Sequence, residues 1–416
     1  KKMKVPEGNP NRASNKRILV VGGGVSGMTA ALEMAEAGYD TVLVEKSAAL
    51  GGWASQLVKR VPSMQPYADP ADTGIAELAA RVGAHPRIKL HLNSTIAQTN
   101  GAPGRFAVDI AQESGATVTE EVGALIQATG FTPYDMMKLP ELGAGKSPNV
   151  VDQLGLEKLV KAAQDNGGGA VKRPSDGGEV KSVVFIQCAG QRDEAMESGG
   201  KHLPYCSGHC CATSIKQAMY FKDANPDIDT MVMYTDLRVP GTGEDFYRSG
   251  QQKGVTFTKG KTSSVEAAGN ACKVNFKDLI LNEDVSVEAD LVVLATGMVA
   301  NSGMNIDIPE EEVAKMEVKP ISILNLNYRQ GKDMPQLKSG FADSHFICFP
   351  YETRRTGIYA AGPVRRPMDM TQAVEDATGA AMKAIQAVEN ASLGRAAHPR
   401  AGDLSYPIVR LEGCTQ

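Results

Sequence analysis

Short apolar runs that end in small-residue turns recur along this chain. The first run, residues 17–21, stops at a group of glycines, and residues 28–37 then show the apolar spacing of a helix that ends at Gly38. A second run, residues 41–44, ends in Glu45. The pattern predicts a strand, a glycine turn, a helix and a second strand within about 30 residues, which is the arrangement of a nucleotide-binding α/β unit.

Two later runs repeat one pattern, a strand followed by an Ala-Thr-Gly turn. They occupy residues 124–130 and 291–297. Their likeness predicts two related dinucleotide-type folds in the chain. Between them, residues 183–187 open a second α/β region, and the polar, glycine-rich residues 164–181 predict an exposed loop.

Composition and charge narrow the functional classes. The chain has 416 residues, enough for two domains or for one domain inserted into another. Its net charge of -4 argues against a nucleic-acid binder. No apolar run reaches the ~18 residues of a membrane span, and residues 1–16 are polar and basic, without the apolar core of a secretory signal. We therefore expect a cytoplasmic protein with a disordered N-terminal arm, residues 1–15, that reaches a membrane only through a partner.

The glycine turn after the first run has the composition of a dinucleotide-binding fingerprint. Gly22 permits a tight turn, Gly24 lets the backbone approach a pyrophosphate, and Gly27 lets helix and strand pack closely. The N-terminus of the following helix offers free N–H groups and a positive dipole end to the phosphates. Glu45, at the end of the second strand, is expected to accept hydrogen bonds from ribose hydroxyls. The turn therefore predicts a nucleotide site.

The segment after Glu45 indicates which nucleotide binds. Its spacing, E-K-x-x-x-x-G-G followed by Trp53, resembles the FAD site of the two-dinucleotide-binding-domain flavoproteins, a thioredoxin-reductase-like family. In that family an Ala-Thr-Gly turn lies near FAD, and a late strand, here residues 357–362, leads to the flavin before a helix, here residues 370–389. The resemblance implies an α/β fold, with a Rossmann-type FAD domain and an inserted second α/β domain.

The same resemblance assigns the residues that contact FAD. They lie in the glycine turn, after the second strand, in the first Ala-Thr-Gly turn and around the last helix, and are Gly22, Gly24, Val25, Ser26, Gly27, Glu45, Lys46, Gly51, Gly52, Trp53, Thr129, Gly130, Gly362, Met370, Thr371 and Ala373. One position departs from the family. Pro363 follows Gly362 where the family has an aspartate that bonds the ribityl chain, so another group must supply that contact.

The second α/β region lacks the glycines of a nicotinamide site. Cys188 stands directly after the strand, and one glycine, Gly190, lies in the turn where two or three are needed. The side-chain clearance for a pyrophosphate is therefore missing. This pattern argues against an NAD(P)H-dependent disulfide reductase.

Seven cysteines, an odd number without an export signal, argue against a disulfide framework. Four of them fall within 24 consecutive residues and indicate a metal site, namely Cys188, Cys206, Cys210 and Cys211. Four thiolates suit an iron–sulfur cluster. Zinc would accept them as well, and four unligated buried thiols are the remaining alternative. We interpret Cys272, Cys348 and Cys414 as inert buried thiols, and His202 and His209 as ordinary polar residues.

The residues around the four cysteines resemble the A subunit of heterodisulfide reductase. The matching segments are residues 185–194, 205–211, 234–238 and 243–247. The resemblance implies that the four cysteines hold a [4Fe–4S] cluster close to FAD. It also places Lys216, five residues after the cysteine pair, near the flavin.

Two features separate this sequence from the larger members of that family. It contains no ferredoxin-like cysteine run, and residues 65–78 contain no cysteine. This compact pattern resembles the A-subunit family of the quinone-interacting membrane-bound oxidoreductase complex of sulfate reducers. A compact A subunit of a sulfur-oxidising heterodisulfide-reductase-like complex is similar enough to stay open. The resemblance implies several partners: a second subunit with flavin and iron–sulfur centres, a haem subunit in the membrane, and a soluble sulfur-metabolism reductase as a further candidate. It also implies a peripheral place at the inner membrane.

These inferences combine into a predicted organisation and function. Residues 16–150 and 299–416 form the two parts of the FAD domain, and residues 151–298 form the inserted region with the cluster. We expect electron relay between FAD and the cluster, with Lys216 stabilising reduced flavin by its charge. The alternatives are a stand-alone NAD(P)H-dependent flavin reductase and a non-catalytic FAD-binding scaffold.

Overall fold

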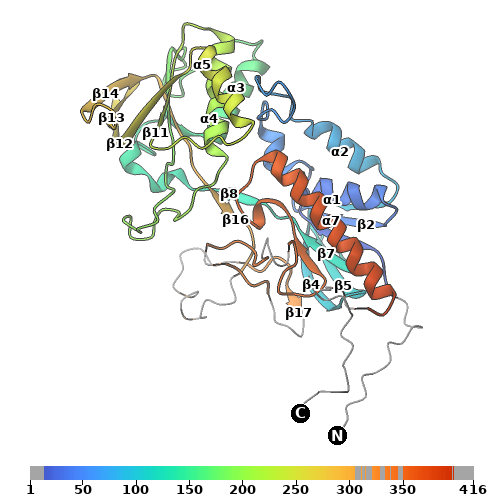
Figure 1. Ribbon diagram of the computed structural model, residues 1–416. Coiled ribbons are helices and arrows are strands. Elements are labelled where there is room, and N and C mark those ends of the chain that lie inside the picture. Colours follow the sequence, from blue (N-terminus) through green and yellow to red (C-terminus); the bar gives the residue numbers. More distant parts are fainter. Residues whose placement is uncertain are drawn as a thin grey trace.

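The computed structural model consists of two α/β regions joined by a narrow two-stranded connection (Figure 1). It describes residues 14–304, 311, 314, 321–327, 333–337, 339–344, 350–395 and 397. Most of the predicted N-terminal arm lies outside the described residues, as do Cys348 and Cys414.

The first region is built on a five-stranded parallel sheet. In spatial order its strands are β18 (Ile358–Ala360), β7 (Ala124–Gln127), β1 (Ile18–Val21), β2 (Thr41–Val44) and β3 (Ile88–His91). Helices α1 (Val25–Glu36) and α7 (Met370–Ser392) pack together, and α2 (Ile75–Ala84) lies beside α1. These strands and helices lie where the apolar runs predict them. The first helix begins at Val25 rather than Met28, because Gly24 already occupies its N-cap position.

Both faces of the five-stranded sheet are covered, which explains its continuous apolar strands. Ile18 and Val20 share a buried cluster with residues of α1 and α7. Leu19 and Val21 point to the opposite face, where a smaller sheet packs on them. The strands of this smaller sheet are β17 (Leu326–Asn327), β4 (Ser94–Ala102), β5 (Arg105–Gln112) and β6 (Thr117–Val122). The first region therefore has three layers.

The second region is built on a seven-stranded sheet. In spatial order its strands are β14 (Asp284–Ala289), β13 (Ala271–Asp278), β12 (Thr256–Ala268), β11 (Asp229–Tyr234), β10 (Ser182–Ile186), β15 (Leu291–Leu294) and β9 (Val150–Asp152). The pairs from β12 to β9 are parallel, while β12, β13 and β14 form an antiparallel ribbon. Its helices are α3 (Gln153–Asp165), α4 (Cys210–Ala224) and α5 (Gly243–Gln252). Residues 166–181, between α3 and β10, contain no helix or strand, as the sequence predicts.

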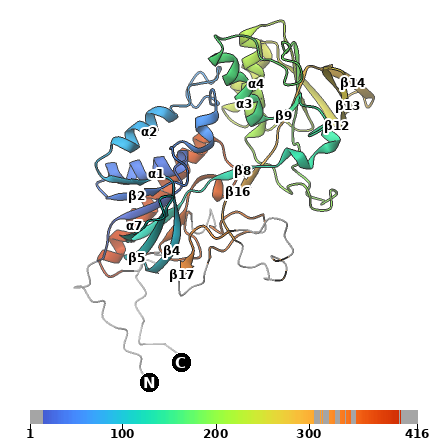
Figure 2. The ribbon, with the colours of Figure 1, turned by 180° about the vertical axis from the view of Figure 1, so that it is seen from behind.

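The connection between the regions is an antiparallel pair, β8 (Phe131–Pro133) with β16 (Met298–Ala300) (Figure 2). Two short 3-10 helices, η2 (Met136–Lys138) and η3 (Pro140–Leu142), follow β8. Tyr134, Leu139 and Ala144 are buried in the core of the second region. The chain therefore enters that region earlier than the predicted division at residue 151, whereas the return at β16 lies at the predicted one.

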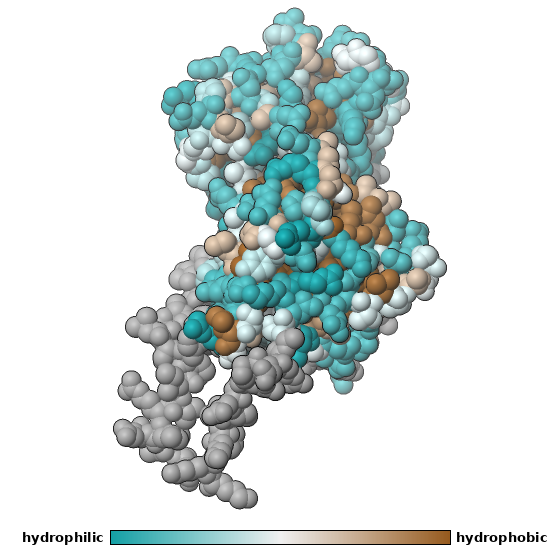
Figure 3. Space-filling model, turned by 90° about the vertical axis from the view of Figure 1, so that its right-hand side faces the viewer, coloured by the Kyte–Doolittle hydropathy of each residue, from teal (hydrophilic) through white to brown (hydrophobic). Residues whose placement is uncertain are grey.

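The surface is mainly hydrophilic and narrows at a waist between the two regions (Figure 3). On the face shown there, apolar side chains gather near this waist. Within the part of the chain that the structure describes, no helix has both the length and the apolar character that crossing a membrane requires.

Two candidate cofactor sites

The turn between β1 and α1 has the close contacts that its glycines predict. A Cβ atom on Gly27 would lie 1.7 Å from the carbonyl oxygen of Gly22. Gly22 itself has a φ of +109°, and a Cβ there would lie 2.4 Å from the carbonyl oxygen of Ala128. A Cβ on Gly24 would meet no atom within 4 Å. Gly22 and Gly27 are thus required by the fold, whereas Gly24 faces open space, as a residue beside a pyrophosphate should.

The carboxylate of Glu45 holds this turn in shape. Its Oε2 accepts a hydrogen bond from the Gly23 N–H at 2.6 Å, and its Oε1 accepts one from the Ser47 N–H at 2.8 Å. The Gly51 N–H donates to the Gly23 carbonyl at 2.8 Å, so the second glycine pair lies against the first turn. The ribose contact predicted for Glu45 remains a prediction, while its support of the turn is a role that the sequence did not indicate.

The other predicted FAD residues lie around the same edge of the sheet. The Trp53 indole, in the 3-10 helix η1 (Gly52–Gln56), donates to the Phe131 carbonyl at 2.7 Å. The Thr129 hydroxyl donates to the Asn301 carbonyl. At the start of α7, the Thr371 hydroxyl accepts a hydrogen bond from Arg60 at 2.9 Å. Of the remaining predicted residues, Ala373 is buried and Lys46 is exposed.

A buried ion pair supports the turn at Gly362, where the family aspartate is missing. The Asp376 carboxylate accepts from the Gly362 N–H at 2.8 Å and from two nitrogens of Arg365, at 2.7 and 3.0 Å. A Cβ on Gly362 would lie 2.0 Å from the hydroxyl oxygen of Ser26, so this turn contacts the glycine turn of β1. Sequence reasoning missed Asp376. An acid on the alanine-rich, buried face of α7 was the signal that could have revealed it.

The four clustered cysteines converge in the second region. Cys188 follows β10 with a left-handed φ of +58°, Cys206 lies in the loop before α4, and Cys210 and Cys211 are the first two residues of α4. All six pairs among these sulfurs repel one another when charged. Among the described residues, no three His, Cys, Asp or Glu side chains converge on a single-ion position. The four sulfurs are therefore spread more widely than zinc ligands, which lie ~2.3 Å from one ion.

Each of these sulfur atoms has an N–H group directed at it. The backbone N–H of Gly208 lies 3.4 Å from the sulfur of Cys206, and that of Arg238 lies 3.4 Å from the sulfur of Cys211. Two side chains supply the others. Gln191 Nε2 lies 3.2 Å from the sulfur of Cys210, and Arg192 Nη1 lies 3.9 Å from that of Cys188.

Gln191 also joins the cysteine segments to the strand that returns to the first region. Its Nε2 donates to the Ala295 carbonyl at 3.0 Å, and its Oε1 accepts from the Ser207 N–H at 3.1 Å. The Ser207 hydroxyl in turn accepts from the Met298 N–H at 2.9 Å. Sequence reasoning gave Gln191 no role, because a glutamine in a turn is usually a surface residue.

Burial makes ionisation of these thiols unfavourable when no metal is bound. It raises the pKa of Cys188 and Cys210 above the usual range and that of Cys211 to about 11. As a thiol, Cys210 donates to the Thr296 carbonyl at 3.3 Å. Burial, and then the charge of Lys216, lowers the pKa of the neighbouring His209 to about 4.

Lys216 lies between the two regions in a buried ion pair. Its amine donates to Glu157 Oε1 and to the Lys59 carbonyl, both at 2.7 Å. Glu157 Oε2 also accepts from the Val58 N–H at 2.8 Å. Burial lowers the pKa of Lys216, while the charge and hydrogen bond of Glu157 oppose that shift. The predicted flavin contact of Lys216 stays a prediction; its contacts in the structure link α4 to the segment that follows the predicted FAD residues Gly52 and Trp53.

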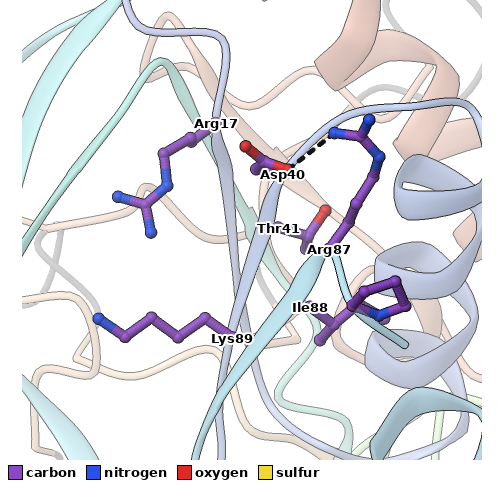
Figure 4. Close-up of a pocket in the computed structure, with 7 residues that line it drawn as sticks. Arg17, Asp40, Thr41, Arg87, Ile88 and Lys89 are labelled. Carbon is purple, nitrogen blue, oxygen red and sulfur yellow. Dashed lines mark hydrogen bonds and ion pairs between the residues drawn. The ribbon is translucent and has the colours of Figure 1, made fainter. Parts of the chain in front are cut away.

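A separate pocket lies at the opposite edge of the five-stranded sheet, near the amino ends of β2 and β3 (Figure 4). Arg87 and Asp40 pair across it at 3.0 Å. Arg17 and Lys89 also line it, and both donate to Glu120, at 2.8 and 2.6 Å. Ligands of such sheets bind outside the carboxyl ends of the strands. This pocket is therefore not a candidate cofactor site.

Comparisons with known proteins agree with this geometry. A family model of FAD-dependent oxidoreductases matches residues 17–127. The A 2 iron–sulfur subunit of CoB–CoM heterodisulfide reductase from Methanopyrus kandleri is 28% identical, over 89% of this chain and 64% of that protein. The A subunit of the H(2):CoB-CoM heterodisulfide,ferredoxin reductase from Methanothermobacter marburgensis is 29% identical, over 88% of this chain and 63% of that protein. The chain thus spans slightly less than two thirds of these relatives.

Solved structures show the same fold at low sequence identity. Thioredoxin reductase of T. acidophilum aligns with 89% of this chain and 98% of its own, with a TM-score of 0.54 and 13% identity. Thioredoxin reductase of Lactococcus lactis aligns with 90% of this chain and 99% of its own, with a TM-score of 0.53 and 15% identity. These likenesses confirm the predicted fold class. The chain is an oxidoreductase with a thioredoxin-reductase-like α/β fold, and FAD is the cofactor that its matched residues support.

Proposed function

We propose that this chain relays electrons between FAD, bound at the β1 turn, and a [4Fe–4S] cluster held by Cys188, Cys206, Cys210 and Cys211. The observation that carries the proposal is the N–H group directed at each of these sulfurs. Such donors stabilise thiolates, and hydrogen bonds to sulfur are a regular feature of iron–sulfur sites. A metal would also offset the cost of ionising thiols whose burial raises their pKa.

The surroundings of Cys188 also fit a further bound group. Gln187 directly precedes this cysteine, and in the described part of the chain both polar atoms of its side chain are buried without a hydrogen-bond partner. Buried amides are rarely left so, and each such group needs an explanation. An inorganic cluster with acceptor sulfurs is one. The wide arrangement of the four cysteines favours a cluster over one zinc ion.

The chain's own residues would hold the two cofactors in a fixed relation. Helix α4 carries Cys210 and Cys211 at its first turn, and its Lys216 bonds the Lys59 carbonyl of the first region. Between these ends, Phe131 lies with its ring centre 6.4 Å from that of Trp53 and 6.5 Å from that of His209. FAD exchanges electrons in pairs or singly and a cluster exchanges them singly, so proximity is the main service of the protein.

The relatives suggest the setting in which this relay would work. Their names are those of subunits of heterodisulfide reductases, so we propose that this chain is a subunit of a heterodisulfide-reductase-like complex. More narrowly, we propose the A subunit of a quinone-interacting membrane-bound complex of sulfur metabolism. Its partners would be a second subunit with flavin and iron–sulfur centres and a haem subunit in the membrane, which would hold it at the inner membrane. Affinity purification from a native host, followed by haem spectroscopy of the co-purified subunits, tests this setting.

Anaerobic purification of the full chain tests the relay itself. We expect one FAD, four iron and four sulfide per chain, and an electron paramagnetic resonance signal of a reduced cluster after dithionite. In stopped-flow mixing with NADPH or NADH, we expect no rapid bleaching of the flavin. Absence of iron would refute the cluster. Rapid bleaching would instead support a stand-alone nicotinamide-dependent reductase, and a cluster that exchanges no electrons with FAD would support a scaffold.

A further inference from the structure

Arg192 is the charged side chain whose guanidinium is directed at one of the four sulfurs. Its Nη1 lies 3.9 Å from the sulfur of Cys188 and 3.4 Å from the Thr235 hydroxyl. Its Nη2 donates to Asp236 Oδ2 at 2.8 Å. The distance to sulfur is long for a strong hydrogen bond, so the main effect on Cys188 is that of a nearby positive charge.

The backbone around Arg192 is held in an unfavourable conformation. Cys188, Gly190 and Arg192 all have positive φ angles, of +58°, +70° and +62°. This region is rarely adopted by residues other than glycine, and such geometry persists only where the surroundings enforce it. Here the Tyr134 ring packs against Gly190. The turn therefore fixes Cys188 and Arg192 in place.

The guanidinium of Arg192 is also partly shielded from water. Its side chain is 21% exposed, and within the described residues its Nε is buried without a hydrogen-bond partner. Asp236, by contrast, is 58% exposed, so water screens its charge more strongly. The positive charge therefore acts on Cys188 more than the negative charge cancels it.

We propose that Arg192 raises the reduction potential of the cluster, and that Asp236 is a positioning residue that holds the guanidinium beside Cys188. The inference rests on the proposed function, because it needs the cluster. Reduction adds one negative charge to the cluster, and a fixed cation stabilises the reduced state more than the oxidised one. Of the N–H groups directed at the sulfurs, only that of Arg192 carries a full charge.

A redox titration of the anaerobically purified chain, followed by electron paramagnetic resonance, tests the proposal. We expect R192Q to keep its iron and to shift the reduction equilibrium about tenfold toward the oxidised cluster, which is about 59 mV more negative for one electron. R192K keeps a cation and should restore part of the shift. R248Q removes the same charge from an exposed position on α5 and should leave the potential unchanged.

The role of Asp236 requires a double-variant comparison. D236N should lower the potential by less than R192Q does, and should add nothing in the R192Q background. A higher potential in D236N would show that Asp236 acts only as a charge and would overturn its positioning role. Absence of iron in the wild-type chain overturns the proposed function and this inference together. Iron in R192Q with an unchanged potential overturns only the inference, as does loss of iron in R192Q, since Arg192 would then hold the cluster.

Discussion

The turns that follow β1 and β10 occupy equivalent places in their two sheets. Each central strand is flanked by a parallel strand that leads into an Ala-Thr-Gly turn, β7 beside β1 and β15 beside β10. Each turn leads to a helix, α1 or α4. In the first, Gly27 allows a contact that any side chain would prevent, and Gly24 leaves open space. In the second, Cys188 stands at the start and a long loop brings Cys206 to the first residues of α4.

This difference shows how one backbone arrangement can serve two kinds of cofactor. A pyrophosphate is bound by backbone N–H groups, so the first turn works by removing side chains. A metal cluster is bound by side chains, so the second turn works by supplying them. N–H groups serve in both turns, toward phosphate oxygens in one and toward sulfurs in the other. The comparison predicts that each turn can be disabled while the other cofactor stays bound.

The largest expected effect is loss of the cluster in C210S. Cys210 is buried and receives the Gln191 amide, so serine would leave one iron site without its thiolate. We expect iron content and cluster signal to fall more than tenfold while FAD stays bound, as measured by metal analysis and flavin absorbance. C272S alters a buried cysteine outside the four and should retain its iron. Equal iron in C210S and wild type would contradict the assignment.

The next effect concerns the ion pair that links the two turns. In E157Q, the buried Lys216 loses its carboxylate partner, and we expect a loss of about 3–5 kcal/mol in the free energy of unfolding, measured with urea. The pKa of Lys216 is lowered by burial even with Glu157 opposing the shift, so the folded variant binds protons less well than the unfolded one. Part of the stability should therefore return as the pH rises toward the ordinary lysine range.

Glu179 provides the matched control for this ion pair. It pairs with Lys172 at 3.2 Å, and both side chains are more than half exposed. E179Q should change stability by less than about 1 kcal/mol, because exposed pairs contribute little. Similar losses in E157Q and E179Q would show that the buried link does not hold the two regions together.

A smaller effect distinguishes the glycines of the first turn from one another. Because a Cβ on Gly24 meets no atom, G24A should fold with unchanged thermal stability but bind FAD about tenfold more weakly, since the methyl group would lie in the space meant for phosphate. G27A should instead destabilise the fold itself. G83A, in open space on α2, is the control and should bind FAD normally. Unchanged FAD affinity in G24A, measured by fluorescence titration, would contradict the predicted site.

The sequence predicted the first turn better than the second for a physical reason. Contacts within the β1 turn, such as that of Gly27 with the Gly22 carbonyl, are local, and glycine spacing reveals them. The apolar strands were equally clear, because buried parallel strands are apolar on both faces. The cysteine cluster was visible as a composition, but the donors directed at it were not. The Arg238 N–H reaches Cys211 from after β11, and only the tertiary fold brings these segments together.

Polar groups that join distant segments were the main omissions from the sequence analysis. Asp376 meets Gly362 across a turn and a helix, and Glu157 meets Val58 across the two regions. Nothing local marks a glutamate on a helix as buried, because most glutamates on helices face water. Lys216 was selected by resemblance alone, and its partner in the structure was not anticipated.

The smallest expected effect lies at the opposite edge of the first sheet and separates support of the sheet from support of the FAD turn. Glu120, on β6, accepts hydrogen bonds from Lys89, Arg17 and His91 at 2.6, 2.8 and 3.1 Å. Burial alone would raise the pKa of Glu120, but these bonds outweigh it and hold the pKa below its usual value of 4.5. A carboxyl with a lowered folded-state pKa stabilises the fold above its unfolded-state pKa, and this stability is lost as the pH falls through the folded-state value.

E120Q should therefore lose about 1 kcal/mol of stability at neutral pH, and its stability should fall less steeply than that of wild type below pH 4.5. E121Q, at the exposed neighbouring position, should keep the wild-type slope. Urea unfolding at several pH values measures the slope, and flavin fluorescence measures FAD affinity in the same samples. FAD affinity at neutral pH should stay unchanged in E120Q, because Glu120 lies away from the carboxyl ends of β1 and β2. A parallel loss of FAD affinity would mean that this edge of the sheet also positions the glycine turn, and the two ends could no longer be treated as independent.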